Sequence, residues 1–546
     1  MRKAGNSTEQ RAAYDDETEL LAHAQKIYTP LTFPCGRSMP NRLVKVPLYE
    51  HFGPIWGGPP HEGHYALYVR WSSGGWGMVA TGNVQVDKRH ISMGRDLLIP
   101  DVLTPETLAP WRRLAQIMHT GRDSDEADGM MPAPSLQSPL GPPLALLQLS
   151  HSGRQSLNFL GGRLPFEPPL APSPIRLGHA HAAKDGWFSR LLHQLAYQVP
   201  REMTHADIQV VIAQFVRGAR LAVESGFDGV QIHAAHGYLL TQFISPKTNT
   251  RTDEYSADKD PLRLVREIVH AVRAAVPNDF IVGMKLNSAD YTRESAQPER
   301  DRALDHVREI GRWGLVDYIE VSGGDYEDPQ FIDSSANFKS PRQVLFESFA
   351  ERSVEILAES TPPNRAPPLV CLTGGLNTLP KMASVLARSH AHMLGIGRAS
   401  IIHPDLPVKL YESLQKRLAG APDEFLMVEP PELSEDGLGV PPPTYLSWRS
   451  LERLILILLK TIWSFVPLEF PRLFGAGQNV SWHNMMLRRI AFGREVDYTK
   501  GTIATALEFF LCTTPYPLRK GGQGKLWWVM AGLIGVAIGL GLGQFL

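Results

Sequence analysis

The chain has 546 residues, a formal net charge of -1 at pH 7 and 43% hydrophobic residues. This length allows one large domain with extensions, and the balanced charge gives no electrostatic basis for a nucleic acid partner. The three cysteines (Cys35, Cys371 and Cys512) form no CxxC pair, which argues against a disulfide framework. Three are also too few for a four-cysteine iron–sulfur cluster built from this chain alone.

The first residues of the chain are polar and acidic. Residues 1–24 contain no apolar core of the kind that a secretory signal requires. We therefore interpret residues 1–28 as a polar N-terminal lead that is disordered or loosely helical.

From about residue 29, short apolar runs alternate with longer helical patterns, as in βα units. The runs expected to be strands are residues 41–48, 77–82, 144–149, 229–232, 280–286, 318–321, 369–372 and 392–397. The intervening helical patterns are residues 62–71, 105–119, 206–225, 261–275, 302–313, 341–360 and 379–387. No GxGxxG motif opens a helix after a strand, so a Rossmann domain has no support. The alternation predicts an α/β fold, a (β/α)8 TIM barrel over residues 29–418, with a proline-rich surface insertion at 121–143.

Three further segments follow the barrel. Residues 419–450 are expected to form a Pro-rich linker, and residues 451–525 a helical extension. The strongly apolar stretch 451–466 carries charged residues, which predicts an amphipathic helix packed on the barrel or lying in a membrane interface. A buried helix is the alternative.

The last segment, residues 526–546, contains no charged residue and is long enough to cross a bilayer. It opens with Trp527 and Trp528, and basic residues precede it, namely Arg519, Lys520 and Lys525. Glycines recur every fourth residue at positions 535, 539 and 543, as in packed membrane helices. We expect a single-pass C-terminal membrane anchor with the catalytic domain facing the cytosol. A buried hairpin or a glycine-rich tail is the alternative.

Polar side chains follow the fourth expected strand. His233, His236 and Tyr238 come directly after its apolar residues. Burying such groups is costly unless they are paired or functional, and the C-terminal ends of barrel strands are where ligands bind. These three residues are the candidate catalytic groups.

Glycines mark the ends of the seventh and eighth strands. Gly374 and Gly375 follow one strand, and Gly397 precedes Arg398 at the end of the other. Backbone N–H groups and a guanidinium at this place form the usual phosphate site of a barrel. The pattern favours a phosphate-bearing cofactor.

Two more polar residues end strands three and five. Gln148 offers both a donor and an acceptor, as the pyrimidine edge of a flavin requires. Lys285 would stabilise negative charge that develops on a flavin at N1 and O2 during reduction. For Lys285 taken alone, a salt-bridged structural residue remains the alternative.

These residues resemble the old yellow enzyme family of FMN-dependent NADH:flavin oxidoreductases, or ene-reductases. The ordered motifs that carry the resemblance lie at residues 41–44, 148–154, 200–204, 229–240, 245–246, 249–255, 373–375 and 397–398. The resemblance implies FMN as the cofactor and NAD(P)H as the reductant. It also implies ping-pong reduction of the C=C bond of a small α,β-unsaturated carbonyl substrate.

The resemblance also implies roles for individual residues. Those expected to contact the flavin ring are Pro47, Gly82, Gln148 and Lys285, and those expected to hold the FMN phosphate are Gly375, Gly397 and Arg398. His233 and His236 would bind the substrate carbonyl, and Tyr238 would donate the proton. Lys285 stands where the family often has arginine. Tyr49 stands where the family commonly has threonine or cysteine beside flavin O4, and would either bond the flavin edge or fill the substrate pocket.

Three other interpretations stay open. His233 and His236 are also compatible with a metal-dependent barrel hydrolase, with His179 and His181 as further ligands. The flavin would alternatively serve a non-redox isomerisation, or the protein would be a membrane-held binding module. The sequence leaves the substrate, the choice between NADH and NADPH, and a homo-oligomeric state undecided.

Overall fold

The computed structural model describes residues 17–123, 140–178, 194–288, 296–322, 341–421, 458 and 472–497. The expected membrane anchor at 526–546, the linker from 422 onward, the middle of the insertion (124–139), His179 and His181 lie outside these residues. In the described part of the chain, no helix combines the length and apolarity needed to span a bilayer.

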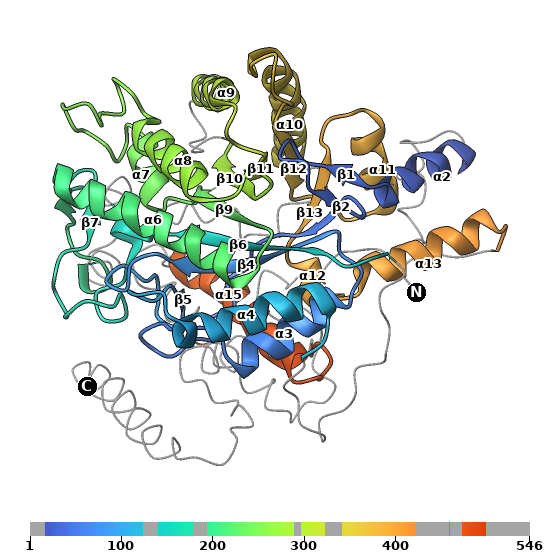
Figure 1. The fold of residues 1–546 in the computed structure, drawn as a ribbon, viewed down its shortest axis with the longest axis horizontal. Coiled ribbons are helices and arrows are strands. Elements are labelled where there is room, and N and C mark those ends of the chain that lie inside the picture. Colours follow the sequence, from blue (N-terminus) through green and yellow to red (C-terminus); the bar gives the residue numbers. More distant parts are fainter. Residues whose placement is uncertain are drawn as a thin grey trace.

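A closed barrel of parallel strands is the centre of the described structure (Figure 1). Eight described strands form the ring: β3 (Leu43–Lys45), β4 (Met78–Gln85), β6 (Leu144–Ser150), β9 (Gly229–Ala234), β10 (Ile281–Asn287), β11 (Tyr318–Ser322), β12 (Leu369–Thr373) and β13 (Met393–Ile396). Parallel pairing of β13 with β3 and of β3 with β4 closes it. This confirms the predicted (β/α)8 barrel. Strand β9 continues to Ala234, so His233 lies within the strand and not after it.

Helices surround the ring as the sequence pattern predicts (Figure 1). The long ones are α3 (Glu62–Ser72), α4 (Pro105–Thr120), α6 (His205–Ser225), α8 (Arg263–Ala275), α9 (Ala296–Trp313), α10 (Pro341–Ser360) and α11 (Leu379–Ala387). Helix α6 begins in a capping box between Thr204 and Asp207 and ends at Gly226, whose φ of 86° suits glycine. Two short helices, α7 (Leu239–Ile244) and α12 (Ala399–Ile402), follow β9 and β13, and the longer α13 (Leu406–Leu418) comes after α12.

Short strand pairs that the sequence did not predict flank the barrel. Antiparallel β1 (Leu31–Thr32) and β2 (Ser38–Met39) precede it. Strand β5 (Leu97–Leu98) pairs in parallel with the last residues of β4, and β7 (Leu170–Ala171) pairs with β8 (Arg201–Glu202).

The second half of the expected N-terminal lead is ordered. Helix α2 (Glu17–Gln25) and the 3-10 turn η2 (Lys26–Tyr28) pack against α11, and α2 also contacts α13. Ala24 and Ile27 are fully buried there. Of the two expected states of the lead, disordered or loosely helical, residues 17–25 take the helical one, and the segment supplies apolar side chains to the barrel's outer layer.

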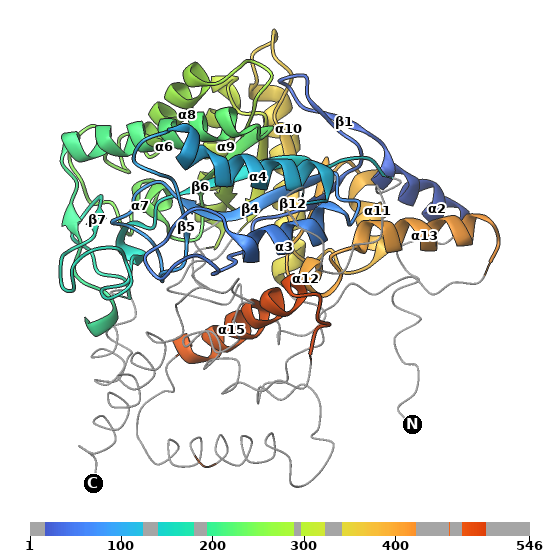
Figure 2. The ribbon, with the colours of Figure 1, turned by 60° about the horizontal axis from the view of Figure 1, so that its bottom comes forward.

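Part of the C-terminal extension packs on the barrel. Helix α15 (Arg472–Ala491) contacts α3 and α12 (Figure 2). Met486 and Leu487 belong to the main hydrophobic core, and Arg488 is buried among them. The sequence showed no usable motif in this region.

The interior of the barrel changes from apolar to polar along the strands. Val44, Met78, Leu146, Ile281 and Met393 form a buried cluster separate from the main core. Side chains alternate faces along a strand. The next interior position after Leu146 on β6 is therefore Gln148, and the next two after Ile281 on β10 are Gly283 and Lys285. The polar layer lies at the C-terminal ends of the strands, where the sequence places the site.

Candidate active site

Gln148 and Lys285, the two residues assigned to the flavin pyrimidine edge, are joined by a buried network. Lys285 Nζ lies 2.9 Å from Glu320 Oε1, and Gln231 Nε2 donates to Glu320 Oε2 at 2.8 Å. Gln148 Nε2 in turn donates to Gln231 Oε1 at 2.6 Å. Sequence reasoning gave no role to Gln231 or Glu320. Their register could have indicated one, because Gln231 lies beside Gln148 and Glu320 beside Lys285 in the sheet.

His233 is a neutral imidazole with a defined tautomer. Its Nδ1 accepts a hydrogen bond from the Ala235 N–H at 3.3 Å, so the ring proton lies on Nε2. Burial, followed by the charges of His236 and Lys285, holds the pKa of His233 well below its usual value of 6.5. The residue is therefore suited to donate a hydrogen bond without carrying charge.

His236 lies in a tight turn after β9. Its φ of 58° is in the left-handed region. Its N–H donates to Asn287 Oδ1 at 3.1 Å, and its carbonyl accepts from Gln155 Nε2 at 2.8 Å. The ring Nε2 is 2.8 Å from Ser322 Oγ, which orients the imidazole. These contacts hold a strained turn in place.

Tyr238 completes the group at the end of β9. The ring centroids of His233 and Tyr238 are 4.7 Å apart, and those of His233 and His236 are 5.2 Å apart. Asn83 Nδ2 donates to Tyr238 Oη at 2.9 Å. This bond uses a lone pair of the phenol and stabilises negative charge on its oxygen, which is compatible with proton donation by Tyr238. The structure thus brings the three predicted catalytic residues together, and adds Asn83.

The segment after β3 forms another wall of the site. Tyr49 Oη donates to the Gly94 carbonyl at 3.0 Å, and the Tyr49 and His51 rings are 5.1 Å apart. Burial raises the pKa of the neighbouring Asp96 to about 7, although hydrogen bonds from the Gln85 side chain and the Ser92 N–H act in the opposite direction. The hydroxyl of Tyr49 is therefore bonded to protein and does not need a flavin partner.

Gly82 is required by packing within the protein itself. Its N–H donates to Glu50 Oε1 at 2.7 Å. A Cβ at this position would lie 2.2 Å from the Leu48 carbonyl oxygen. Its expected contact with the flavin, and that of Pro47 on the same wall, stay predictions.

The glycines at β12 and β13 behave differently. Gly374 and Gly375 have φ values of 104° and 69°, a conformation in which successive N–H groups can face an anion. A Cβ on Gly397 would approach Leu48 and Val46 only to 3.7 Å, which is ordinary contact. Protein packing therefore does not explain a glycine there, and the expected phosphate contact of Gly397 and Arg398 stays a prediction. The hydrogen-bond donors at the site fit the two ends of FMN. Backbone N–H groups and the Arg398 guanidinium suit its phosphate, and the Gln148 amide and the Lys285 ammonium suit its ring.

Residues 143–417 match the NADH:flavin oxidoreductase / NADH oxidase family. The chain is 35% identical over 386 residues to "NADH-dependent flavin oxidoreductase iliE" of Hypocrea jecorina, covering 69% of this chain and 87% of that relative. The chain belongs to this family. A relative of the same name from Neonectria sp. is 35% identical over 380 residues, which cover 69% of this flavin oxidoreductase but only 46% of the relative.

Solved structures agree on the fold of this flavin oxidoreductase. Morphinone reductase superposes with a TM-score of 0.52 at 21% identity, over 72% of this chain and 90% of that one. The old yellow enzyme homologue from Zymomonas mobilis gives 0.51 at 19% identity, over 73% and 94%. With the family match, these comparisons confirm the resemblance to the old yellow enzymes and show that the chain is an enzyme of the flavin oxidoreductase type.

A second group of polar residues lies at the mouth of the flavin oxidoreductase barrel. Asp87, His90 and His151 approach closely enough to suggest a metal site. However, His90 Nε2 accepts from the Leu170 N–H at 2.9 Å, and His151 Nδ1 accepts from the Gly153 N–H at 3.1 Å. The nitrogens that face Asp87 therefore carry the protons. His90 Nδ1 is 2.9 Å from Asp87 Oδ2, a hydrogen bond that clamps two parts of the loop together, whereas His151 Nε2 lies 3.7 Å from the same oxygen. Although burial acts in the opposite direction, these imidazoles hold the pKa of Asp87 well below its usual range.

The structure describes only part of the hydrolase alternative, because His179 and His181 lie outside the described residues. Within the described residues, neither His233 nor His236 belongs to a group of three metal-ligating side chains. The Nδ1 lone pair of His233 is also occupied by a backbone N–H.

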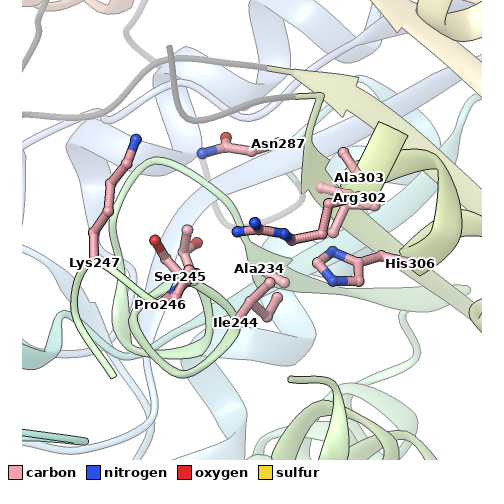
Figure 3. Close-up of a pocket in the computed structure, with 11 residues that line it drawn as sticks. Ala234, Ile244, Ser245, Pro246, Lys247, Asn287, Arg302, Ala303 and His306 are labelled. Carbon is pink, nitrogen blue, oxygen red and sulfur yellow. The ribbon is translucent and has the colours of Figure 1, made fainter. Parts of the chain in front are cut away.

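A pocket lies beside His233 and His236, between the ends of β9 and β10 and helices α7 and α9. Arg302 extends into it, with Asn287, Lys247 and His306 around the rim (Figure 3). Asn287 links this pocket to the site, because its side chain also accepts the N–H of His236.

Proposed function

We propose that this flavin oxidoreductase binds FMN and uses NAD(P)H to reduce the C=C bond of small α,β-unsaturated carbonyl compounds. The observation that carries the proposal is the convergence of His233, His236 and Tyr238 at the end of one strand. The ring centroids of His236 and Tyr238 lie 5.2 Å and 4.7 Å from that of His233. The names of the fungal relatives, NADH-dependent flavin oxidoreductases, support NADH as the reductant.

The chain's own residues account for binding and proton transfer. The Nε2–H of His233, and the imidazole of His236, donate to the substrate carbonyl and stabilise the charge that builds on its oxygen. Tyr238 gives its proton to the α-carbon, and Asn83 stabilises the resulting phenolate. FMN, when bound and reduced, supplies the hydride for the β-carbon. Because one pocket accepts both the reductant and the substrate, the kinetics are ping-pong.

The cofactor residues divide between the two ends of FMN. Gln148 and Lys285 face the pyrimidine ring, with Pro47 and Gly82 beside the isoalloxazine. Gly375, Gly397 and Arg398 hold the phosphate. Of the two roles considered for Tyr49, we propose the second, filling of the substrate pocket, because its hydroxyl already donates to Gly94.

The test is an absorbance spectrum of the purified protein, followed by anaerobic reduction with NADH or NADPH and reoxidation with 2-cyclohexenone. We expect a flavin spectrum that bleaches with the nucleotide and returns with the enone. Bound FMN that the enone cannot reoxidise would favour a non-redox isomerase or a binding module instead. Bound zinc without flavin colour would favour the hydrolase.

We also propose that residues 526–546 anchor the protein in a membrane, with the barrel in the cytosol. The support is the uncharged stretch, its two opening tryptophans and the basic residues before it. Removal of residues 525–546 should move the protein from the membrane pellet to the supernatant. Retention in the pellet would assign membrane binding to another segment, such as 451–466.

A further inference from the structure

One buried carboxylate holds several of the side chains beneath the proposed flavin site. Glu320 is 1% exposed. Its Oε1 lies 2.9 Å from Lys285 Nζ and accepts from Thr373 Oγ1 at 3.1 Å. Its Oε2 accepts from Gln231 Nε2 at 2.8 Å. A buried charge with this many partners is satisfied, and removing it would leave Lys285 uncompensated.

The charge of Glu320 also sets the direction of a hydrogen-bond chain. An ionised carboxylate only accepts hydrogen bonds, so the amide nitrogen of Gln231 must face it. The hydroxyl of Tyr318 receives the same nitrogen at 2.9 Å. The amide oxygen of Gln231 then faces Gln148 and accepts its Nε2 at 2.6 Å. The Gln148 amide is thereby fixed with its oxygen, an acceptor, free to face a ligand, and its second N–H beside it.

An acceptor at this place matches flavin chemistry. The pyrimidine edge of an isoalloxazine offers one donor, N3–H, between two carbonyl oxygens. Gln148 with its oxygen forward accepts that N–H, whereas the reversed amide would not. The Lys285 ammonium is suited to the neighbouring N1 and O2, where charge develops on reduction.

We propose that Glu320 is a positioning residue for the pyrimidine end of the flavin, fixing Gln148 as an acceptor and holding Lys285 while offsetting its charge. The inference rests on the proposed flavin site and adds a residue that neither the sequence motifs nor the comparisons assign. Glu320 touches neither flavin nor substrate in this account. It acts through Gln231 on one side and Lys285 on the other.

The charge-offsetting role predicts the sign of a redox effect. Reduction adds negative charge to the flavin, and the carboxylate of Glu320 opposes it across a site of low dielectric constant. Glu320→Gln should therefore make the reduction potential of bound FMN more positive. We expect the ratio of dissociation constants for oxidised and reduced FMN to rise about tenfold, which equals about 30 mV for a two-electron couple.

Two further variants separate the two arms of Glu320. Lys285→Met should shift the potential in the negative direction, because it leaves the carboxylate unopposed. Gln231→Met keeps the ion pair and breaks the amide chain, so it should weaken FMN binding with a smaller shift in potential. Glu267→Gln is the charge-matched control on α8, where the carboxylate pairs with Arg263 away from the site, and it should change neither quantity.

The experiment measures the potential spectroelectrochemically and FMN affinity by titration, together with melting temperature. A lower melting temperature with unchanged potential and affinity in Glu320→Gln would reduce Glu320 to a structural residue. If Glu320→Gln does not fold, the other two variants test the proposal. An unchanged FMN reduction potential in Lys285→Met together with an unchanged FMN affinity in Gln231→Met would overturn it. Failure of enone reduction alongside the expected shifts would count against the proposed reaction and leave this inference standing. A purified protein that binds no FMN would contradict both.

Discussion

Asn83 Nδ2 donates a hydrogen bond of 2.9 Å to the hydroxyl of Tyr238, which lies 155 residues further along the chain. The bond connects β4 to the turn that follows β9, so the proposed proton donor is held by a strand on the other side of β6. Its geometry leads to a matched pair of variants.

Tyr238→Phe removes the proton donor and leaves the ring. We expect reoxidation of the flavin by an enone to slow about 10²–10⁴-fold, the range for general acid catalysis, while reduction by NADPH stays near normal. Stopped-flow measurement of the two half-reactions gives the answer. Asn83→Ala should produce a smaller loss in the same half-reaction. Equal slowing of both half-reactions would mean that Tyr238 shapes the pocket and does not donate the proton.

Replacing His233 and His236 together with alanine should weaken the binding of the enone and lower its turnover. Loss of oxyanion-type donors costs about 10²–10³-fold in rate. FMN should remain bound, because the phosphate-binding groups lie on other strands. Spectral titration of the oxidised enzyme with the enone measures the first effect, and the flavin-to-protein absorbance ratio measures the second. Release of FMN would contradict the assigned role.

Alanine substitutions at Gly397 and Gly82 are expected to have opposite effects, although both glycines are expected to contact FMN. A Cβ on Gly397 has room within the protein, at 3.7 Å from its nearest neighbours. Gly397→Ala should therefore fold normally, with an unchanged melting temperature before FMN is added, but bind FMN more weakly. A Cβ on Gly82 would lie 2.2 Å from the Leu48 oxygen, so Gly82→Ala should lower the melting temperature even without FMN. Normal FMN affinity in Gly397→Ala would remove that residue from the phosphate site.

Leu487 tests whether the C-terminal extension belongs to the folded unit. Its side chain is 2% exposed between α15 and the barrel. Leu487→Ala should cost about 2–5 kcal/mol in the free energy of unfolding. Leu458, which is 58% exposed in the same extension, is the control, and Leu458→Ala should have little effect in denaturant titrations. Equal stability of the two variants would show that α15 does not pack as the structure has it.

The clamp around His90 predicts a pH dependence of stability. Burial, followed by the charge of His151, lowers the pKa of His90 from 6.5 to about 3, in spite of the hydrogen bond to Asp87. Between these values the unfolded chain binds a proton that the folded chain does not, so stability falls as the pH decreases from about 6.5 toward 3. The slope for this group is at most about 1.4 kcal/mol per pH unit. His90→Gln should show a shallower slope in denaturant titrations across this range, and an unchanged slope would contradict the assignment.

Local sequence patterns were sufficient for much of the barrel. The eight strands lie where apolar runs alternate with helical patterns, and the capped start of α6 at Thr204 follows from its own side chain. The packing of the N-terminal helix α2 was not predicted, because its mean composition is polar and the residues that it buries, such as Leu20 and Ala24, are few and spaced along one face. Helix α15 falls within the expected helical extension, but its packing was not predicted, because its partners, α3 and α12, lie far away in the sequence.

The sequence by itself determined which chemical groups this protein has. The run from residue 229 to 240 carries His233, His236 and Tyr238 within a single turn and strand end, so their proximity follows from short-range chain connectivity. The tertiary structure alone decided how those groups are supported. Asn83 reaches Tyr238, and Glu320 reaches both Lys285 and Gln231, only because the barrel sets its strands in a particular register. Register is a property of paired strands and not of either strand's own residues, which is why the carboxylate beneath the flavin site became visible only in the folded barrel.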